Sequence, residues 1–217
     1  MADELIRSAL APFGFEPSAT VAAAIRRYTQ LLQRWNKHIS LTSLEDTKEI
    51  LERHFGESLF VVHIVPILQG RLADVGSGGG FPGLPIKIAC PQLELVLIES
   101  NARRAAFLSE VTRTLGLTGV RVVNKRMEDI HSLADSLDFV AARALGDIPE
   151  LLNWSRSSLR ADGKTVLWLG ANDARKISSS PGWIWRPPVP LPRSEKRVVL
   201  IGERVRSATK ANGVASQ

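Results

Sequence analysis

Apolar side chains recur at helical spacing in the first third of the chain. Within residues 18–35 they include Val21, Ile25 and Leu32, close to the three- and four-residue intervals that place side chains on one helix face. Ser18 is a residue type that caps helix N-termini. We therefore predict a long helix here. Two shorter helices are predicted over residues 46–51 and 55–65.

The pattern changes after residue 70, where short apolar runs alternate with amphipathic segments. Strands that alternate with helices along a chain form a parallel sheet with helices on both faces. The last two predicted strands read as an antiparallel pair. The predicted strands are 72–75, 93–99, 120–124, 137–143, 165–169, 183–189 and 196–201, and the predicted helices are 82–89, 103–115 and 148–159.

These patterns divide the chain into three parts. Residues 1–68 form an N-terminal helical extension, residues 69–206 hold the sheet, and residues 207–217 form a flexible tail. A chain of 217 residues can bury a proper core but is short for two full domains. The predicted fold class is therefore α/β, with a Rossmann-like, mostly parallel sheet of seven strands.

Composition excludes several classes of protein. Hydrophobic residues make up 44% and charged residues 23% of the chain, as in ordinary globular proteins. No apolar run approaches the roughly 18 residues of a membrane span, and the first residues lack the pattern of a secretion signal. The single cysteine, Cys90, allows neither an internal disulfide nor a multi-cysteine metal site. We therefore expect a cytoplasmic protein with no membrane partner and no metal.

Basic residues gather in the sheet-forming part. Residues 1–70 hold 7 basic and 8 acidic side chains, whereas residues 71–217 hold 21 basic and 14 acidic ones. One cluster, between residues 101 and 126, includes Arg103 and Arg104, and a second lies near the C-terminus. Clustered basic residues on a domain of high isoelectric point are typical of a nucleic-acid binder. We therefore expect a polyanionic substrate.

The most specific motif follows the first strand of the predicted sheet. Residues 71–83 read Arg-Leu-Ala-Asp-Val-Gly-Ser-Gly-Gly-Gly-Phe-Pro-Gly, so an apolar run ends in Asp74 and turns through glycines. Glycine lets the backbone approach a ligand where a Cβ would collide. The next apolar run ends in Glu99. Asp74 and Glu99 are therefore expected at the carboxyl ends of neighbouring parallel strands, a place suited to a nucleoside with a free ribose.

Two cofactors compete for this motif. Residues 78–83 match the G-x-G-x-x-G template of nicotinamide dinucleotide enzymes, and Glu99 lies about 20 residues on. However, the glycine that directly follows the strand is Gly76, and its own pattern reaches Phe81 in place of the last glycine. Asp74 also puts negative charge where a pyrophosphate would lie, whereas S-adenosylmethionine has an amino group and no phosphate. The residues therefore favour an S-adenosylmethionine enzyme, with a nicotinamide enzyme as the alternative.

Six segments carry a resemblance to a known family. They are Trp35-Asn-Lys-His-Ile-Ser-Leu-Thr-Ser43, Arg53-His54 with Glu57-Ser58, Asp74-Val-Gly-Ser-Gly-Gly-Gly-Phe-Pro-Gly-Leu-Pro85, Leu97-Ile-Glu-Ser100, Arg126-Met-Glu-Asp129 and Ala142-Arg-Ala144. With these motifs the chain resembles, over most of its length, the GidB/RsmG family of bacterial 16S ribosomal RNA guanine-N7 methyltransferases. The resemblance implies a seven-stranded class I methyltransferase fold with an N-terminal helical extension.

The resemblance also implies roles for individual residues around S-adenosylmethionine. Glu99 would bind the ribose hydroxyls. Arg143 would be the active-site arginine, which either neutralises an RNA phosphate or shapes the pocket around the methionine end; the alternative is a structural ion pair with Glu99 or Asp74. Together with Asp74, the predicted cofactor-binding residues are Gly76, Gly78, Phe81, Glu99, Met127, Glu128 and Arg143.

The RNA contacts are less specific. Arg103 and Arg104 belong to the first basic cluster, and a basic residue that the family uses near its last strand maps onto Lys196 or Arg197, with no choice between them. Two positions depart from the resemblance. Ser40 stands where the family often has Asn, and Leu169 stands where it often has Lys before a glycine. These departures concern RNA contacts and leave the cofactor motif intact.

The implied reaction methylates N7 of a guanosine in 16S ribosomal RNA, either naked or in the small subunit, and leaves S-adenosylhomocysteine. Guanine N7 has an exposed lone pair, so the reaction needs positioning and no general base. The alternative is an S-adenosylmethionine-dependent methyltransferase that acts on a protein or on another RNA. We expect a monomer.

Overall fold

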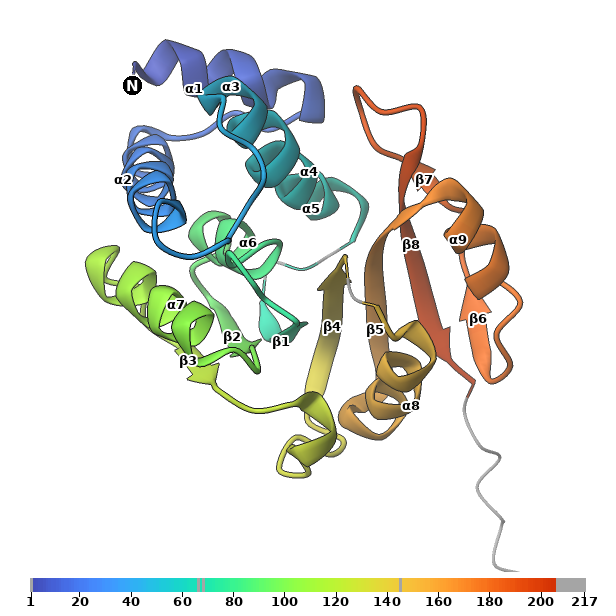
Figure 1. Cartoon of the computed structure of the whole chain (residues 1–217). Coiled ribbons are helices and arrows are strands. Elements are labelled where there is room, and N and C mark those ends of the chain that lie inside the picture. The colour runs from blue at the N-terminus through green and yellow to red at the C-terminus, as the bar shows by residue number, and fades with distance from the viewer. Residues whose placement is uncertain (1, 66, 68, 145, 206–217) are drawn as a thin grey trace, which may run out of the picture.

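The computed structural model describes residues 2–65, 67, 69–144 and 146–205, in which helices precede an α/β sheet (Figure 1). The predicted boundary at residue 68 and the predicted tail 207–217 lie outside the described residues, and the division into three parts stays a prediction. No helix within the described ranges is long and apolar enough to cross a membrane. The same residues hold no cluster of three or more His, Cys, Asp or Glu side chains that could bind a metal ion.

The N-terminal part consists of short helical segments around one long helix. Ser18 caps that long helix, because its hydroxyl accepts a hydrogen bond from the Val21 amide at 3.3 Å. The apolar pattern does not predict the first helix, which has a short buried face of Ile6, Ala9 and Leu10. The segments are α1 (Asp3–Leu10), the 3-10 turn η1 (Ala11–Phe13), α2 (Ala19–Asn36), α3 (Thr47–Ile50), the π-helical turn η2 (Leu51–Gly56), α4 (Glu57–Leu59) and α5 (Val61–Ile64).

The sheet has the strand order β3-β2-β1-β4-β5-β8-β6, and β7 also pairs with β8. The first five strands are parallel, and β8 runs antiparallel to β5, β6 and β7. The strands are β1 (Gly70–Val75), β2 (Leu93–Ile98), β3 (Val120–Val123), β4 (Leu137–Arg143), β5 (Leu159–Gly170), β6 (Trp183–Trp185), β7 (Val189–Pro190) and β8 (Arg197–Arg204).

This topology confirms the predicted fold class, with one difference at the sheet edge. The single strand predicted over residues 183–189 is divided into β6 and β7. Pro187 and Pro188 stand between them, and proline has no N–H group to donate to a strand ladder. The described residues therefore form eight strands, of which seven lie along the main path of the sheet.

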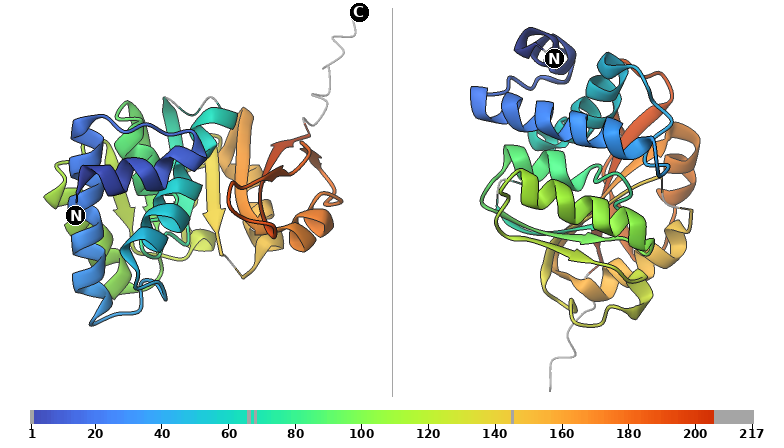
Figure 2. Two further views of the ribbon diagram at one scale, coloured as in Figure 1. Left: turned by 90° about the horizontal axis from the view of Figure 1, so that it is seen from above. Right: turned by 60° about the vertical axis from the view of Figure 1, so that its left-hand side comes forward.

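Side chains alternate between two apolar cores on the two faces of the sheet. Along β1, Leu72 packs with the N-terminal helices, whereas Ala73 and Val75 pack into the core of the opposite face. Figure 2 shows the N-terminal helices stacked over α6 and α7. The remaining segments are α6 (Gly83–Ala89), α7 (Ala102–Thr114), the 3-10 turn η3 (Met127–Asp129), α8 (Ile148–Ser158) and α9 (Ala171–Ile177). The apolar pattern does not predict α9, which buries only two side chains.

Candidate functional site

The predicted site lies at the carboxyl ends of β1, β2 and β4. Strands β1 and β2 are parallel neighbours with Val75 opposite Ile98, so Asp74 and Glu99 stand near the same edge of the sheet. Val75 also faces Ala142 of β4, which places Arg143 one residue beyond. Helices that follow parallel strands direct their N-termini to this edge, where backbone N–H groups are available to ligands.

Asp74 is a fully buried carboxylate with one oxygen free of partners. Its Oδ2 accepts a hydrogen bond from the Gly83 amide at 3.0 Å, whereas its Oδ1 is buried and has no partner among the described residues. Burial, with a smaller contribution from the negative charge of Glu99, raises the pKa of Asp74 to about 7, although the hydrogen bond from Gly83 opposes the rise. A cationic hydrogen-bond donor would therefore stabilise the buried Asp74 Oδ1.

Glu99 is bound to the glycine loop through its carboxylate. Oε2 accepts from the Gly78 amide at 2.9 Å, and Oε1 accepts from the Asn101 amide at 2.8 Å. Gly78 has a φ of +54°, and a Cβ built on it would meet no atom closer than the Gly76 carbonyl oxygen at 3.8 Å. The loop is therefore open on this side, and the carboxylate keeps lone pairs for a hydroxyl group.

A cavity of about 120 Å³ adjoins the glycine loop. It contains three of the predicted cofactor residues, Gly76, Met127 and Glu128, and Glu128 Oε2 is a buried oxygen without a partner among the described residues. The residues that line it are Val75, Gly76, Ile98, Ser100, Lys125, Arg126, Met127 and Glu128. The motifs did not assign Ser100 to the site, although it directly follows Glu99.

The ring of Phe81 is sandwiched between two other rings. Its centroid lies 4.4 Å from that of His54 and 5.3 Å from that of Tyr28, with interplanar angles of 15° and 5°. The Tyr28 hydroxyl donates to the Gly79 carbonyl oxygen. Both faces of Phe81 are thus covered by the N-terminal helices, and Phe55 packs against the ring at an interplanar angle of 81°. Only the backbone of Phe81 and the rest of its ring edge remain for a cofactor. The sequence motifs missed Tyr28, because a tyrosine at a helical core position has no distinguishing signal.

His54 connects this stack to the preceding loop. Its Nε2 lies 2.7 Å from the Thr42 hydroxyl, and Asn36 in turn accepts from the Thr42 amide at 3.0 Å. Burial, together with the positive charges of Arg143 and Arg53, lowers the pKa of His54 to about 3. The imidazole is therefore neutral at physiological pH.

This lowered pKa predicts a loss of stability in acid. Below pH 6.5 the unfolded chain binds a proton at His54 that the folded chain excludes, so stability falls as the pH drops towards 3. At pH 5 the loss is about 2 kcal/mol. His54→Phe keeps the stacked ring and removes the titration, so its urea-unfolding free energy should fall less between pH 7 and pH 5 than that of the wild type. Equal losses in both proteins would contradict this, and His131→Phe, at an exposed position, serves as the control.

Arg143 and Arg197 share one buried carboxylate. Glu57 is 1% exposed; its Oε2 accepts from Arg143 Nη2 at 2.9 Å, and its Oε1 accepts from Arg197 Nη2 at 2.7 Å. The alternative stated for Arg143, an ion pair with Glu99 or Asp74, is wrong, because its partner is Glu57. Arg197 and Lys196, the two basic residues considered near the last strand, differ in their surroundings: Arg197 contacts Glu57, whereas the side chain of Lys196 is exposed. The motifs gave Glu57 no role.

The two arginines of the first basic cluster begin α7. Asn101 caps this helix by accepting from the amides of Arg103 and Arg104 at 3.0 and 3.2 Å. Arg103 is exposed, and Arg104 Nη2 donates to the Ser40 carbonyl oxygen at 3.1 Å. Both therefore follow Glu99 closely, at the same edge of the sheet.

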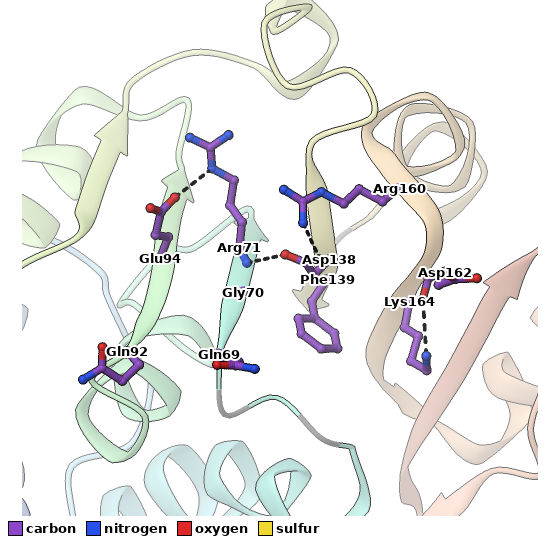
Figure 3. A pocket seen from close by; sticks show the side chains of 10 residues that line it. All are labelled: Gln69, Gly70, Arg71, Gln92, Glu94, Asp138, Phe139, Arg160, Asp162 and Lys164. Carbon is purple, nitrogen blue, oxygen red and sulfur yellow. Dashed lines mark hydrogen bonds and ion pairs between the residues drawn. The ribbon is translucent and has the colours of Figure 1, made fainter.

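A larger cavity of about 930 Å³ lies at the opposite, amino end of the strands (Figure 3). Its cations form ion pairs: Arg71 with Glu94 at 3.3 Å and Arg160 with Asp138 at 3.0 Å. None of the predicted site residues lines it. Although this cavity is larger, we do not assign it as the functional site, because charged side chains that line it already pair with one another.

Comparison with known proteins identifies the family of the chain. The family model described as rRNA small subunit methyltransferase G matches residues 21–181. The chain belongs to this family. Because the members of this family are methyltransferases, the alternative of a nicotinamide enzyme is excluded. The match also extends across residue 68 into the N-terminal helices.

Curated relatives share most of their length with the chain. Ribosomal RNA small subunit methyltransferase G of Stenotrophomonas maltophilia is 36% identical over 187 residues, which are 86% of each chain. The protein of the same name from Neisseria meningitidis is 30% identical over 206 residues, 93% of this chain and 98% of the relative.

Solved structures show the same fold at low sequence identity. A SAM-dependent methyltransferase from Aquifex aeolicus is 14% identical, with a TM-score of 0.63 over 76% of this chain and 97% of that one. A ribosomal protein L11 methylase from Lactobacillus delbrueckii is 15% identical, with a TM-score of 0.59 over 71% of this chain and 80% of that one.

Proposed function

We propose that this protein transfers the methyl group of S-adenosylmethionine to N7 of a guanosine in the ribosomal RNA of the small subunit. The cofactor assignment rests on the buried Asp74 Oδ1, which has no hydrogen-bond partner among the described residues, and on Glu99, whose carboxylate is hydrogen-bonded to the glycine loop at the same edge of the sheet. This acidic pair favours a ligand with an ammonium group and ribose hydroxyls over a pyrophosphate. The family and the basic surface support an RNA substrate.

The residues present fit S-adenosylmethionine. Asp74 Oδ1 would accept from the ammonium group of the methionine end, and the free lone pairs of Glu99 would accept from ribose hydroxyls. The cavity lined by Met127 and Glu128 would hold the adenine, and the unpartnered Glu128 Oε2 is an acceptor for its exocyclic amine. S-adenosylmethionine supplies an electrophilic methyl group on a sulfonium.

The protein itself positions the reactants and excludes water. Guanine N7 needs no general base, so correct placement supplies most of the rate enhancement, up to roughly 7–11 kcal/mol. Arg143 and Arg197 supply positive charge at the carboxyl edge of the sheet, where an RNA phosphate would be neutralised. Lys125 and Arg126 are exposed at the cavity and form no ion pair among the described residues. The target base must be unpaired to enter such a site.

Glu99→Gln should weaken the binding of S-adenosylmethionine. Glutamine has similar volume, but its amide nitrogen cannot accept a hydrogen bond from Gly78 or Asn101 and its charge is lost. A charge-assisted hydrogen bond contributes about 1.5–3 kcal/mol, so we expect a roughly 10- to 150-fold rise in Kd by isothermal titration calorimetry. The matched control is Glu94→Gln at the amino end of β2, the strand that Glu99 directly follows, and it should leave Kd unchanged. Equal Kd values in all three proteins would refute the role of Glu99.

The reaction itself is tested with methyl-labelled S-adenosylmethionine and small ribosomal subunits from cells that lack this protein. Nucleoside analysis of the RNA should show the label as 7-methylguanosine. Label in protein, or in another nucleoside or RNA, would refute the proposed target but would still show that the protein transfers methyl groups. Absence of S-adenosylmethionine binding would refute the proposal as a whole.

A further inference from the structure

We propose that Glu57 is a positioning residue that holds Arg143 and Arg197 side by side as one fork for a phosphodiester of the RNA. The inference rests on the proposed function, because the fork acts on the RNA that is methylated. Glu57 comes from α4 in the N-terminal part, whereas the arginines come from the last residue of β4 and the first residue of β8. The carboxylate thus joins the N-terminal helices to the carboxyl edge of the sheet.

The geometry around Glu57 fixes both guanidinium groups. Arg143 Nη2 donates to Oε2 at 2.9 Å, and Arg197 donates to Oε1 through Nε at 3.0 Å and Nη2 at 2.7 Å. Two main-chain carbonyls of the same helical segment add further contacts: Arg53 O accepts from Arg143 Nη1 at 2.7 Å, and Glu57 O accepts from Trp168 Nε1 at 2.8 Å. Since Glu57 is 1% exposed, its carboxylate is shielded from solvent and is held in place by these contacts.

The cluster carries more positive than negative charge. One carboxylate faces two guanidinium groups, and Arg53, which lies on the same helical segment, is paired to Glu49 at 2.8 Å. Burial lowers the pKa of Arg143, and the negative charge of Glu57 opposes this lowering. An arginine has five N–H groups, and the described contacts of Arg143 use two of them. Arg197 is about one-third exposed, so the open side of the pair is free to bind an anion.

A phosphodiester is the anion that suits this fork. Planar guanidinium groups bind phosphate oxygens with two parallel hydrogen bonds, and RNA presents a phosphate beside every base. Because the two guanidinium groups are held at a fixed separation, they would fix the position of the nucleotide that neighbours the target guanosine. The backbone of Ala144, directly after Arg143, has a φ of +55°, a left-handed conformation that is uncommon for alanine and typical of functional sites.

The test compares Glu57→Gln and Glu57→Asp with the control Glu52→Gln. Glu52 lies in the same helical segment and pairs with the exposed Arg193 at 3.2 Å. Both Glu57 variants should lose about 10- to 100-fold in kcat, because displaced arginines misplace the substrate. Their affinity for the RNA should stay the same, or rise for Glu57→Gln, which removes a negative charge. A merely structural role would lower kcat and RNA affinity together with the folded fraction, and that result, or an unchanged kcat, would overturn the proposal.

A second measurement does not depend on turnover. The Nε–H proton of Arg197 donates to Glu57, so nuclear magnetic resonance should show slow exchange with solvent in the wild type and fast exchange in Glu57→Asp. Equal exchange in both would overturn the positioning role. A wild-type protein that transfers no methyl group to RNA would instead refute the proposed function, so the two failures are distinct.

Discussion

Replacing Arg143 by alanine is expected to lower kcat/KM for methylation of the small subunit about 100- to 1000-fold, the range found when one preorganised donor is removed from an active site. The side chain is 15% exposed and stands at the carboxyl end of β4, beside the strand that carries the glycine loop. In such a site a fixed cation acts on an anion with little screening by water. The change is measured by steady-state transfer of labelled methyl groups.

The same variant should keep its fold and its cofactor affinity. Glu57 retains Arg197 as a partner, so its carboxylate is not left buried alone. The matched control is Arg160→Ala, which removes an exposed arginine paired with Asp138 at the amino end of the sheet and should leave kcat/KM unchanged. If Arg143→Ala retained wild-type kcat/KM, Arg143 would have no part in the reaction. A loss of S-adenosylmethionine affinity would place it at the methionine end of the cofactor.

Gly80→Ala is expected to destabilise the protein by about 2–5 kcal/mol. Gly80 has a φ of +89°, and an added Cβ would overlap the Tyr28 hydroxyl and lie 2.5 Å from Leu84 Cδ1. A left-handed conformation costs a non-glycine residue about 1–2 kcal/mol, and overpacking a core costs about 1–3 kcal/mol more. Tyr28 cannot move away cheaply, because its ring is stacked on Phe81 and its hydroxyl donates to the Gly79 carbonyl oxygen.

Gly116→Ala separates the two contributions. Gly116 also has a positive φ, of +62°, but a Cβ there would meet no atom within 4 Å. Its substitution should therefore cost only the backbone term of about 1–2 kcal/mol. Urea unfolding of both variants measures the difference. Equal destabilisation would show that the packing of Tyr28 against the loop is not tight.

The glycine loop was predictable because its chemistry is local in sequence. Asp74, Gly76 and Gly78 lie within five residues, and Glu99 directly follows the next strand. The parallel order of β1 and β2 then brings the two acids to one edge without further information. By contrast, α1 and α9 are short, and a few buried positions make too weak a pattern to separate a helix from a loop.

By itself, the sequence determined the strand–helix alternation, the residues of the cofactor loop and the concentration of basic side chains, because each depends on neighbours a few positions apart. Only the tertiary structure decided that Phe81 is stacked between Tyr28 and His54, and that Arg143 and Arg197 meet at Glu57. These contacts join residues 27 to 140 positions apart. The free energy of a buried ion pair or ring stack depends on distance and burial in the folded chain, which residue spacing does not encode.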